Sequence, residues 1–324
     1  MQTDMTVGKP MKMLLNFTIP VFLGNVFQQL YSMADAVIVG KFVGTKGLAA
    51  VGATGTITFL IIGFLMGVTT GVTVLTSQKF GAGRMDEMRK TVGNAAILSA
   101  VIAVVMTAVS MLGIPTQICF TAISRLKYQS SFFIFSSLNI LGSYAVAAFT
   151  AGSKIDNIFT QAFVAIGTTM STYSAQNVGA RKLDRVRQGF RCADVIGCAY
   201  AVVVGFVLFF VGKSFSYLFI SDNAEAVIPM VDTYLRCVGM FMIPLYVVNC
   251  YRNGFQGMGY GLLPMLSGVA ELIGRGVMAV VAADARSYTM ACMASPFAWI
   301  VATVLLIVLY FYVMKDMKRK LCLQ

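Results

Sequence analysis

The 324-residue sequence contains no histidine, one tryptophan and few charged residues. Without histidine the chain has no imidazole base, no histidine metal ligand and no H-E-x-x-H zinc protease motif. Charged residues make up 12% of the sequence, against roughly 25% in soluble domains. Hydrophobic residues make up 58%, and the mean hydropathy is +0.79. This shortage of charge excludes an ordinary soluble domain and indicates a membrane protein that crosses the bilayer several times.

Seven cysteines are present, but none has the C-x-x-C spacing of a metal or redox motif. Most of them fall within apolar runs, so we expect buried free thiols in place of disulfides or metal ligands. No set of residues resembles a catalytic constellation. We therefore expect neither an enzyme nor a bound metal cofactor.

Uncharged runs separate the charged clusters along the chain. Most of these runs reach the roughly 20 residues that a membrane-spanning helix requires. Polar and apolar residues do not alternate within them, so the spans are predicted to be helices, and the fold to be an all-α polytopic helical bundle. The runs cover residues 13–34, 47–78, 91–124, 157–180, 195–212, 237–251, 253–270 and 287–314.

The net charge of +12 comes from basic residues that lie between or after the apolar runs. This placement is typical of cytoplasmic loops under the positive-inside rule, so membrane lipid is the expected surrounding and nucleic acid is not an expected partner. The same rule predicts cytoplasmic N- and C-termini. The basic clusters are Lys79/Arg84/Arg89/Lys90, Arg181/Lys182/Arg185/Arg187/Arg191 and Lys315/Lys318/Arg319/Lys320.

Two parts of the sequence repeat each other at an offset of 98 residues. Residues 77–86 (Ser-Gln-Lys-Phe-Gly-Ala-Gly-Arg-Met-Asp) are echoed by 175–184 (Ala-Gln-Asn-Val-Gly-Ala-Arg-Lys-Leu-Asp), and 44–51 by 142–149. Internal repeats are a mark of transporter folds. The repeat predicts spans at 13–40, 52–78 and 91–113 in the first copy and at 114–138, 156–178 and 192–212 in the second, followed by 226–251, 258–283 and 288–314.

Segment 114–138 conflicts with the charge distribution. The basic loops at 79–90 and 181–191 should share one side of the membrane, which requires an even number of crossings between them. Arg125 and Lys127 lie in the middle of this segment with no acid nearby. We predict eight firm spans, with 114–138 lying at the outer interface or inserted under strain; alternatively, it spans and its two cations face an aqueous cleft.

Asp35 is the most informative residue in the apolar runs. Apart from Asp4 it is the only acid in the first 85 positions, and it is the one charged residue between positions 13 and 40. An acid within a membrane costs roughly 2.5–3.5 kcal/mol at the helix centre, so such residues usually mark an ion, proton or substrate path. The alternative is a residue at the outer end of a helix, within reach of water.

Other polar residues in the spans have simpler roles. Glu271 and Arg275 are four residues apart, with the acid before the base, which predicts a structural ion pair on one helix face; Asp232 and Arg236 repeat the spacing.

Asn25, Gln28 and Gln29 precede Asp35 by one to three turns. They would line the same cavity as Asp35 or, alternatively, bond neighbouring helices together.

Several motifs resemble those of bacterial multidrug and toxic compound extrusion (MATE) transporters. The resemblance covers nearly the whole chain, and its motifs occur in the order typical of the family. They are residues 17–20 (Phe-Thr-Ile-Pro), 31–40 (Tyr-Ser-Met-Ala-Asp-Ala-Val-Ile-Val-Gly), 48–52 (Leu-Ala-Ala-Val-Gly), 176–180 (Gln-Asn-Val-Gly-Ala), 254–259 (Gly-Phe-Gln-Gly-Met-Gly), 271–275 (Glu-Leu-Ile-Gly-Arg) and 296–299 (Pro-Phe-Ala-Trp).

The resemblance implies a two-lobe transporter in a bacterial inner membrane that exports organic cations and other drugs in exchange for protons or sodium ions. Family members have twelve helices. This chain would keep three helices of the N-terminal lobe (1–113) and five to six of the C-terminal lobe (114–324), with spans four to six missing at a join near residues 112–115. Asp35 would bind the coupling proton or sodium ion, which is the only bound ion expected.

The missing spans leave a second interpretation open. In the family, polar residues from spans five and six join the acid of the first span, and those partners are absent here. The chain would then be a truncated, non-transporting remnant of such a transporter. A lipid-linked oligosaccharide flippase is a third interpretation, which would require a cationic central cavity.

Overall fold

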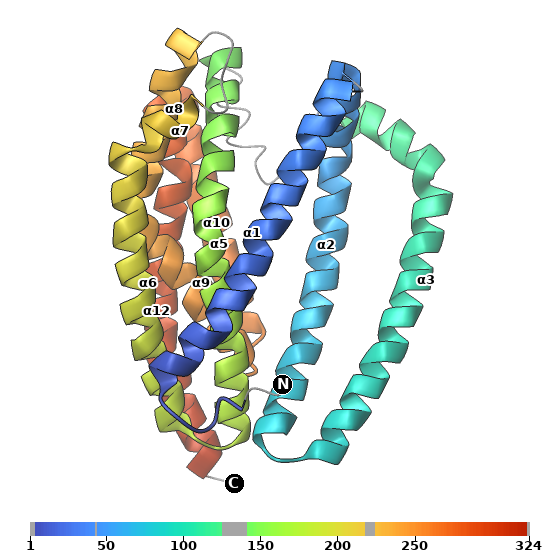
Figure 1. The fold of residues 1–324 in the computed structure, drawn as a ribbon, viewed down its shortest axis with the longest axis vertical. Helices are drawn as coiled ribbons and strands as arrows, with labels where there is room; N and C mark the ends of the chain where they lie inside the picture. The colour runs from blue at the N-terminus through green and yellow to red at the C-terminus, as the bar shows by residue number, and fades with distance from the viewer. Residues whose placement is uncertain (1–3, 43, 125–140, 218–223, 323–324) are drawn as a thin grey trace.

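The computed structural model describes residues 4–42, 44–124, 141–217 and 224–322. Every regular element within these ranges is a helix, and the long helices run side by side (Figure 1). This confirms the predicted all-α helical bundle. The elements are α1 (Pro10–Phe42), α2 (Gly44–Gly81), α3 (Met85–Ser124), α5 (Ser143–Gly179), α6 (Leu183–Phe210), α7 (Gly212–Ser216), α8 (Ala224–Gly239), α9 (Met242–Gly257), α10 (Leu262–Asp284), α11 (Tyr288–Cys292) and α12 (Ala294–Cys322).

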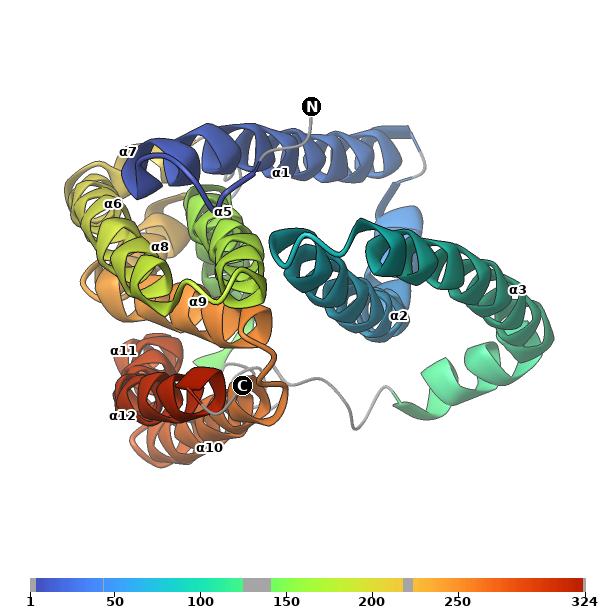
Figure 2. The ribbon, with the colours of Figure 1, turned by 90° about the horizontal axis from the view of Figure 1, so that it is seen from below.

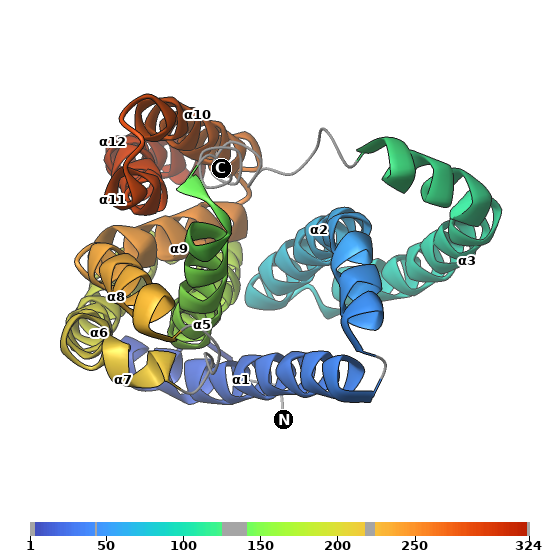
Figure 3. The ribbon, with the colours of Figure 1, turned by 90° about the horizontal axis from the view of Figure 1, so that it is seen from above.

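Helices α5 to α12 form one compact bundle, and α1 to α3 lie along one side of it (Figures 1 and 2). Helix α1 packs against α5 and α6, and α2 packs against α5. Helix α3 packs against α2 and lies away from the bundle (Figure 3). The core of the bundle is built around fully buried aromatic side chains, among them Phe163, Phe190, Tyr246 and Phe255.

Six stretches within the described ranges are long and apolar enough to cross a membrane. They lie in α1, α2, α3, α6, α10 and in the α11–α12 region, and the bent pair α8–α9 would make a seventh. Helix α5 has 37 residues, about 55 Å at the rise of an α-helix, but it is less apolar because it carries buried polar residues such as Thr169, Ser174 and Asn177. With α5, eight segments have the length to cross, in agreement with the predicted eight or nine.

The predicted span 226–251 is not one straight helix. It corresponds to α8 and the first part of α9, which are bent by 53° at the break between them. Pro244 lies in the first turn of α9. Proline has no backbone N–H, which is tolerated in the first turn of a helix, whereas in the middle of one continuous helix a backbone hydrogen bond would be lost. Sequence length and hydropathy do not reveal such a break, since both sides of it are apolar.

The structure does not divide the chain at residue 114, where the sequence predicted that a separate segment, 114–138, begins. Helix α3 is continuous from Met85 to Ser124, so residues 114–124 extend the predicted span 91–113, while residues 125–140 lie outside the described residues. The α2–α3 turn and the α5–α6 turn lie at the same end of the molecule (Figure 1). The two basic loops therefore lie on the same side of the bundle, as the positive-inside rule requires. The division of the chain at residue 113 stays a prediction.

The two copies of the repeat pack directly against each other. A Cβ atom built on Gly81, the last residue of α2, would lie 1.9 Å from the carbonyl oxygen of Gln176, and one on Gly179, the last residue of α5, would lie 1.9 Å from that of Gln78. Only glycine permits so close an approach of two backbones. The repeated Gln-x-x-Gly sequence therefore produces a reciprocal helix contact, which we call the Gln-Gly crossing.

Candidate ion and substrate site

Helix α1 carries the predicted ion-coupling residue, and its first half is held on α5. Leu14 is buried, and the Thr18 hydroxyl donates a hydrogen bond to Thr169 Oγ1 at 2.9 Å. The Thr169 hydroxyl in turn donates to the carbonyl oxygen of Ala165 at 2.8 Å. Such hydroxyl chains satisfy polar groups between helices in a bilayer, so α1 is anchored by a polar contact as well as by packing.

Asp35 lies on α1, 17 residues beyond Thr18 and so about 26 Å further along the helix. Its side chain is outside the described residues, and its predicted place in a cavity stays a prediction. Asn25 and Gln29 are half-buried. Gln28 is exposed but takes part in an interaction within the protein. Gln28 and Asn25 precede Asp35 by seven and ten residues, close to two and three helical turns, so the three residues share one face of α1.

The ion pair between Glu271 and Arg275 is present, and a third residue joins it. Arg275 Nη2 lies 3.2 Å from Glu271 Oε2, while Arg252 Nη2 of α9 pairs with Glu271 Oε1. Arg252 Nε also donates to Ser267 Oγ at 2.9 Å. Arg252 was not among the predicted site residues, because it follows an apolar run and its partner Glu271 lies on another helix. The Arg252–Glu271 pair thus links α9 to α10, and Arg275, on the same helix as Glu271, shares that acid.

Asp232 and Arg236 also form an ion pair, with Arg236 Nε 2.9 Å from Asp232 Oδ2. The Arg236 guanidinium lies over the ring of Phe209 on α6, 5.3 Å from its centroid. Cation–π contacts of this kind stabilise exposed arginines by about 0.5–1 kcal/mol. This pair therefore connects α8 to α6. A structural role for both ion pairs stays a prediction.

Two acids in the bundle were missed by sequence analysis. Asp194 of α6 accepts hydrogen bonds from Tyr246 OH at 3.2 Å and Tyr251 OH at 3.0 Å, both on α9. Asp156 of α5 is 7% exposed. Both lie at or near the start of the predicted spans 156–178 and 192–212 and were given no role, but α5 and α6 begin well before those positions, so both acids lie inside helices.

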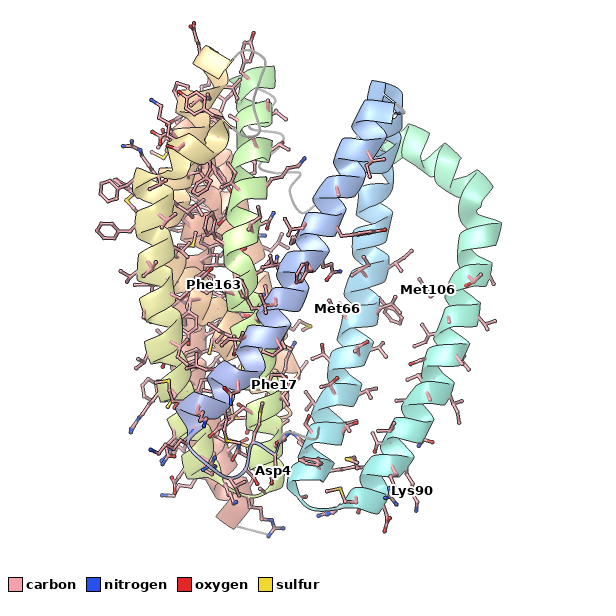
Figure 4. All side chains as sticks on the ribbon, in the orientation of Figure 1. Asp4, Phe17, Met66, Lys90, Met106 and Phe163 are labelled. Carbon is pink, nitrogen blue, oxygen red and sulfur yellow. The ribbon has the colours of Figure 1, made fainter. Side chains whose placement is uncertain are left out.

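The segment before α1 is hydrogen-bonded to Gln176 and Asn177 of the repeat. The Met5 N–H donates to Gln176 Oε1 at 2.8 Å, and Asn177 Nδ2 donates to the Met5 carbonyl at 3.2 Å. Arg185 Nε donates to Asn177 Oδ1 at 3.1 Å. This part of the motif therefore holds the N-terminal segment against α5, with Asp4 at the same end of the molecule as Lys90 (Figure 4).

Asp4 is the acid of this segment. The backbone N–H and the hydroxyl of Thr6 donate to Asp4 Oδ1 at 2.8 and 2.7 Å. These hydrogen bonds hold the pKa of Asp4 below its ordinary value, since they favour the ionised carboxylate. The carbonyl of Thr6 in turn accepts a hydrogen bond from Lys182 Nζ at 3.0 Å.

A groove of about 310 Å³ lies between α6 and the α8–α9 break. The side chains that line it are all apolar. The lining residues include Gly205, Phe206, Phe209, Gly239, Met240 and Ile243. Among the described residues no group of three or more histidine, cysteine or acidic side chains is placed to hold a metal ion.

Side-by-side spanning helices, two packed sequence repeats and ionisable groups within the helices define a class of membrane bundle found in many transporters. The MatE family model matches residues 20–119 and 118–281. The chain belongs to the MatE family, which confirms the resemblance seen in its motifs.

The chain resembles the probable multidrug resistance protein YpnP of Bacillus subtilis, with 31% identity over 78 residues, 24% of this chain and 18% of that protein. It also resembles the probable multidrug resistance protein YoeA of the same organism, with 28% identity over 93 residues, 29% of this chain and 20% of that protein. The matching stretches thus span about a fifth of the length of these curated relatives.

The fold matches a solved multidrug resistance MATE family transporter of the MOP superfamily in an outward-facing conformation. The TM-score is 0.85 at 15% identity, over 97% of this chain and 98% of that chain.

Proposed function

We propose that the chain is a MATE-type antiporter that exports organic cations in exchange for protons or sodium ions, with the Asp35 carboxyl as the coupling group. The observation that carries this proposal is a single acid on α1, the first helix of a MatE family chain, in a stretch with no other charge from residue 13 to residue 40. Intramembrane acids are costly and are usually functional.

The mechanism requires that Asp35 has a different affinity for its ion in two conformations, because a ligand shifts a conformational equilibrium only through differential affinity. Binding of a proton or sodium ion neutralises the carboxylate. An organic cation would compete for the same negative charge, so that entry of one expels the other. The 24 phenylalanines and 21 methionines supply adaptable apolar and cation–π surfaces for flat cations.

The charge distribution supports an orientation in the membrane. The N-terminal segment around Asp4, the α2–α3 turn near Lys90 and the end of α12 lie at one end of the bundle (Figures 1 and 4). That end carries the basic clusters, and the positive-inside rule assigns it to the cytoplasm of a bacterial cell. The cargo would then leave at the opposite end.

Export of a fluorescent organic cation tests the proposal in cells. A drug-hypersensitive bacterial strain expressing the chain should lose preloaded ethidium faster than the same strain with an empty vector. The Asp35→Asn variant should lose this activity while its abundance in the membrane is unchanged. Asp184→Asn is the matched control, because its side chain is 92% exposed. Full export by the Asp35→Asn variant would rule out the coupling role.

A second candidate function is that of a non-transporting remnant. The observation that favours it is the short N-terminal group of helices: among the described helices, α3 packs closely only against α2. The family resemblance places the polar partners of the first-span acid on spans five and six, which it implies are missing from this chain. A remnant would insert and fold but would give no export above the empty-vector control with any cation.

A further inference from the structure

The interior of the α5–α12 bundle contains several buried polar atoms that lack a hydrogen-bond partner. Within the described ranges these include Asp156 Oδ1 on α5, Arg275 Nε on α10 and the Tyr288 hydroxyl on α11. Most buried polar groups in proteins are hydrogen-bonded, so exceptions indicate an unusual requirement of the site. The carboxyl oxygen of Asp156 is costly to leave unpaired, because the carboxyl carries charge when it is ionised.

These groups belong to one cluster, which we call the Asp156 cluster. Tyr234 of α8 is buried in the same region and interacts electrostatically with Asp156, Arg275, Tyr288 and Cys292. Tyr234 also packs edge-on against Phe149, with ring centroids 4.9 Å apart. Helices α5, α8, α10 and α11 therefore all contribute a polar side chain to the same buried region.

The other helices packed on α5 offer no charge to balance Asp156. On α6, Tyr200 donates its hydroxyl hydrogen bond to the Phe159 carbonyl at 2.9 Å, and Asp194 is occupied by the two tyrosines of α9. On α7, Lys213 is exposed. On α8, Arg236 is paired with Asp232, and on α9, Arg252 is paired with Glu271. Among the described residues of α1, α2, α8 and α9, no cation is placed to act on the Asp156 carboxyl.

Burial and the lack of a counter-charge determine whether the Asp156 carboxyl is ionised or protonated. An ionised carboxylate without a partner is strongly disfavoured in a protein interior, whereas a neutral carboxyl is far easier to bury. Among the described residues Arg275 forms no ion pair with Asp156, and its Nη2 is paired with Glu271. The neutral, protonated acid is therefore the form that fits this site.

Asp156 is also remote from the cytoplasmic contacts of the bundle. It precedes Gly179 by 23 residues on the same helix, about 34 Å along the axis. The Gln-Gly crossing and the basic turns therefore lie at the far end of α5. Asp156 belongs to another helix and another part of the fold than Asp35, which lies on α1.

We propose that Asp156 is a second proton-binding site of this protein, one that holds a proton at neutral pH without any contribution from Asp35. The ligand is a proton and not a sodium ion, because the described cluster offers one carboxyl and two phenols, whereas hard cations prefer about six oxygen ligands. Protonation changes the charge inside the α5–α12 bundle by one unit. The site exists whether or not the chain transports anything.

Infrared difference spectroscopy of the purified protein in lipid tests this proposal. The wild-type spectrum at neutral pH should contain the carbonyl stretching band of a protonated carboxyl that is absent from Asp156→Asn and shifted in Asp156→Glu. Asp35→Asn and Asp194→Asn should leave that band in place, which separates this site from the coupling role of Asp35. If neither Asp156 variant alters the band, or if the Asp35 variant removes it, the proposal is wrong.

Asp156→Glu keeps the experiment decisive if Asp156→Asn does not fold. The glutamate variant retains a titratable carboxyl on the same helix, so a protonated carboxyl should remain with its band at another frequency. A spectrum identical to the wild type would overturn the proposal, and a displaced band would support it. The result of this comparison does not depend on whether the protein transports anything.

Discussion

Gly81 and Gly179, which occupy equivalent positions in the two copies of the repeat, each lie against the glutamine backbone of the other copy. An offset of 98 residues relates both Gly81 to Gly179 and Gln78 to Gln176, and each glycine leaves 1.9 Å between a Cβ built on it and the opposing carbonyl oxygen. Gln78 Nε2 also donates to the Gly257 carbonyl at 3.1 Å. The repeat therefore encodes a two-fold-like contact that joins α2 to α5.

The Gln-Gly crossing should not tolerate a methyl group. In Gly81→Ala the new Cβ would overlap the Gln176 carbonyl, so α2 must move away from α5; overpacking of this kind typically costs about 1–3 kcal/mol. We expect a lower melting temperature of the purified protein in detergent. Gly71→Ala on the same helix is the control, because nothing lies within 4 Å of its Cβ, and it should be neutral or slightly stabilising. Equal melting temperatures for the two variants would contradict this account.

Glu271 should be more important for stability than an exposed acid. Glu271→Gln leaves Arg252 and Arg275 without their shared counter-charge. Breaking a buried pair costs about 3–5 kcal/mol, and since both arginines remain partly exposed we expect a smaller loss, on the order of 1–3 kcal/mol. Chemical unfolding of the purified protein would measure it.

Asp184→Asn serves as the reference for this comparison. The Asp184 side chain is 92% exposed and lies 3.9 Å from Arg187 Nη1, so its loss should change the unfolding free energy by less than about 0.5 kcal/mol. If both variants lose the same amount, Glu271 does not bridge α9 and α10 in the membrane.

Arg185 should hold the N-terminal segment on α5. Its guanidinium donates to the carbonyls of Gly8 and Met5 at 3.0 and 3.3 Å and to Asn177 Oδ1 at 3.1 Å. In Arg185→Ala these acceptors lose their donors, and residues 4–9 should be cut faster by a protease added in detergent. The exposed Arg191, when replaced by alanine, should leave the cleavage rate unchanged. Equal rates in both variants would show that Arg185 is not the anchor.

Acid should loosen the same segment through Asp4. The hydrogen bonds from Thr6 hold the pKa of Asp4 below its ordinary value, so the stabilisation is complete above the unfolded pKa of about 3.9 and is lost as the pH falls through the folded pKa. The protection factor of the Thr6 amide in hydrogen exchange should therefore decrease on acidification below about pH 4. In Asp4→Asn that acid-dependent decrease should disappear; its persistence would assign the effect to another group.

The sequence was sufficient to predict most spans but not the contacts between them. Predicted spans 13–40 and 52–78 fall inside α1 and α2, because a run of apolar residues and its flanking charges are local signals. Asp156, Asp194 and Arg252 were missed because their significance comes from neighbouring helices: burial of a carboxyl, two tyrosines of α9, and Glu271 on α10. These depend on packing, which hydropathy does not record.

Cation exchange by purified protein in sealed lipid vesicles tests the central claim most directly. Under an imposed proton or sodium gradient, the wild type should accumulate a fluorescent organic cation at least about ten times faster than the Asp35→Asn variant, a difference equivalent to about 1.4 kcal/mol in the transition-state barrier. The variant should behave like protein-free vesicles. Wild-type uptake no faster than in protein-free vesicles under either gradient, or undiminished uptake by the variant, would contradict the account.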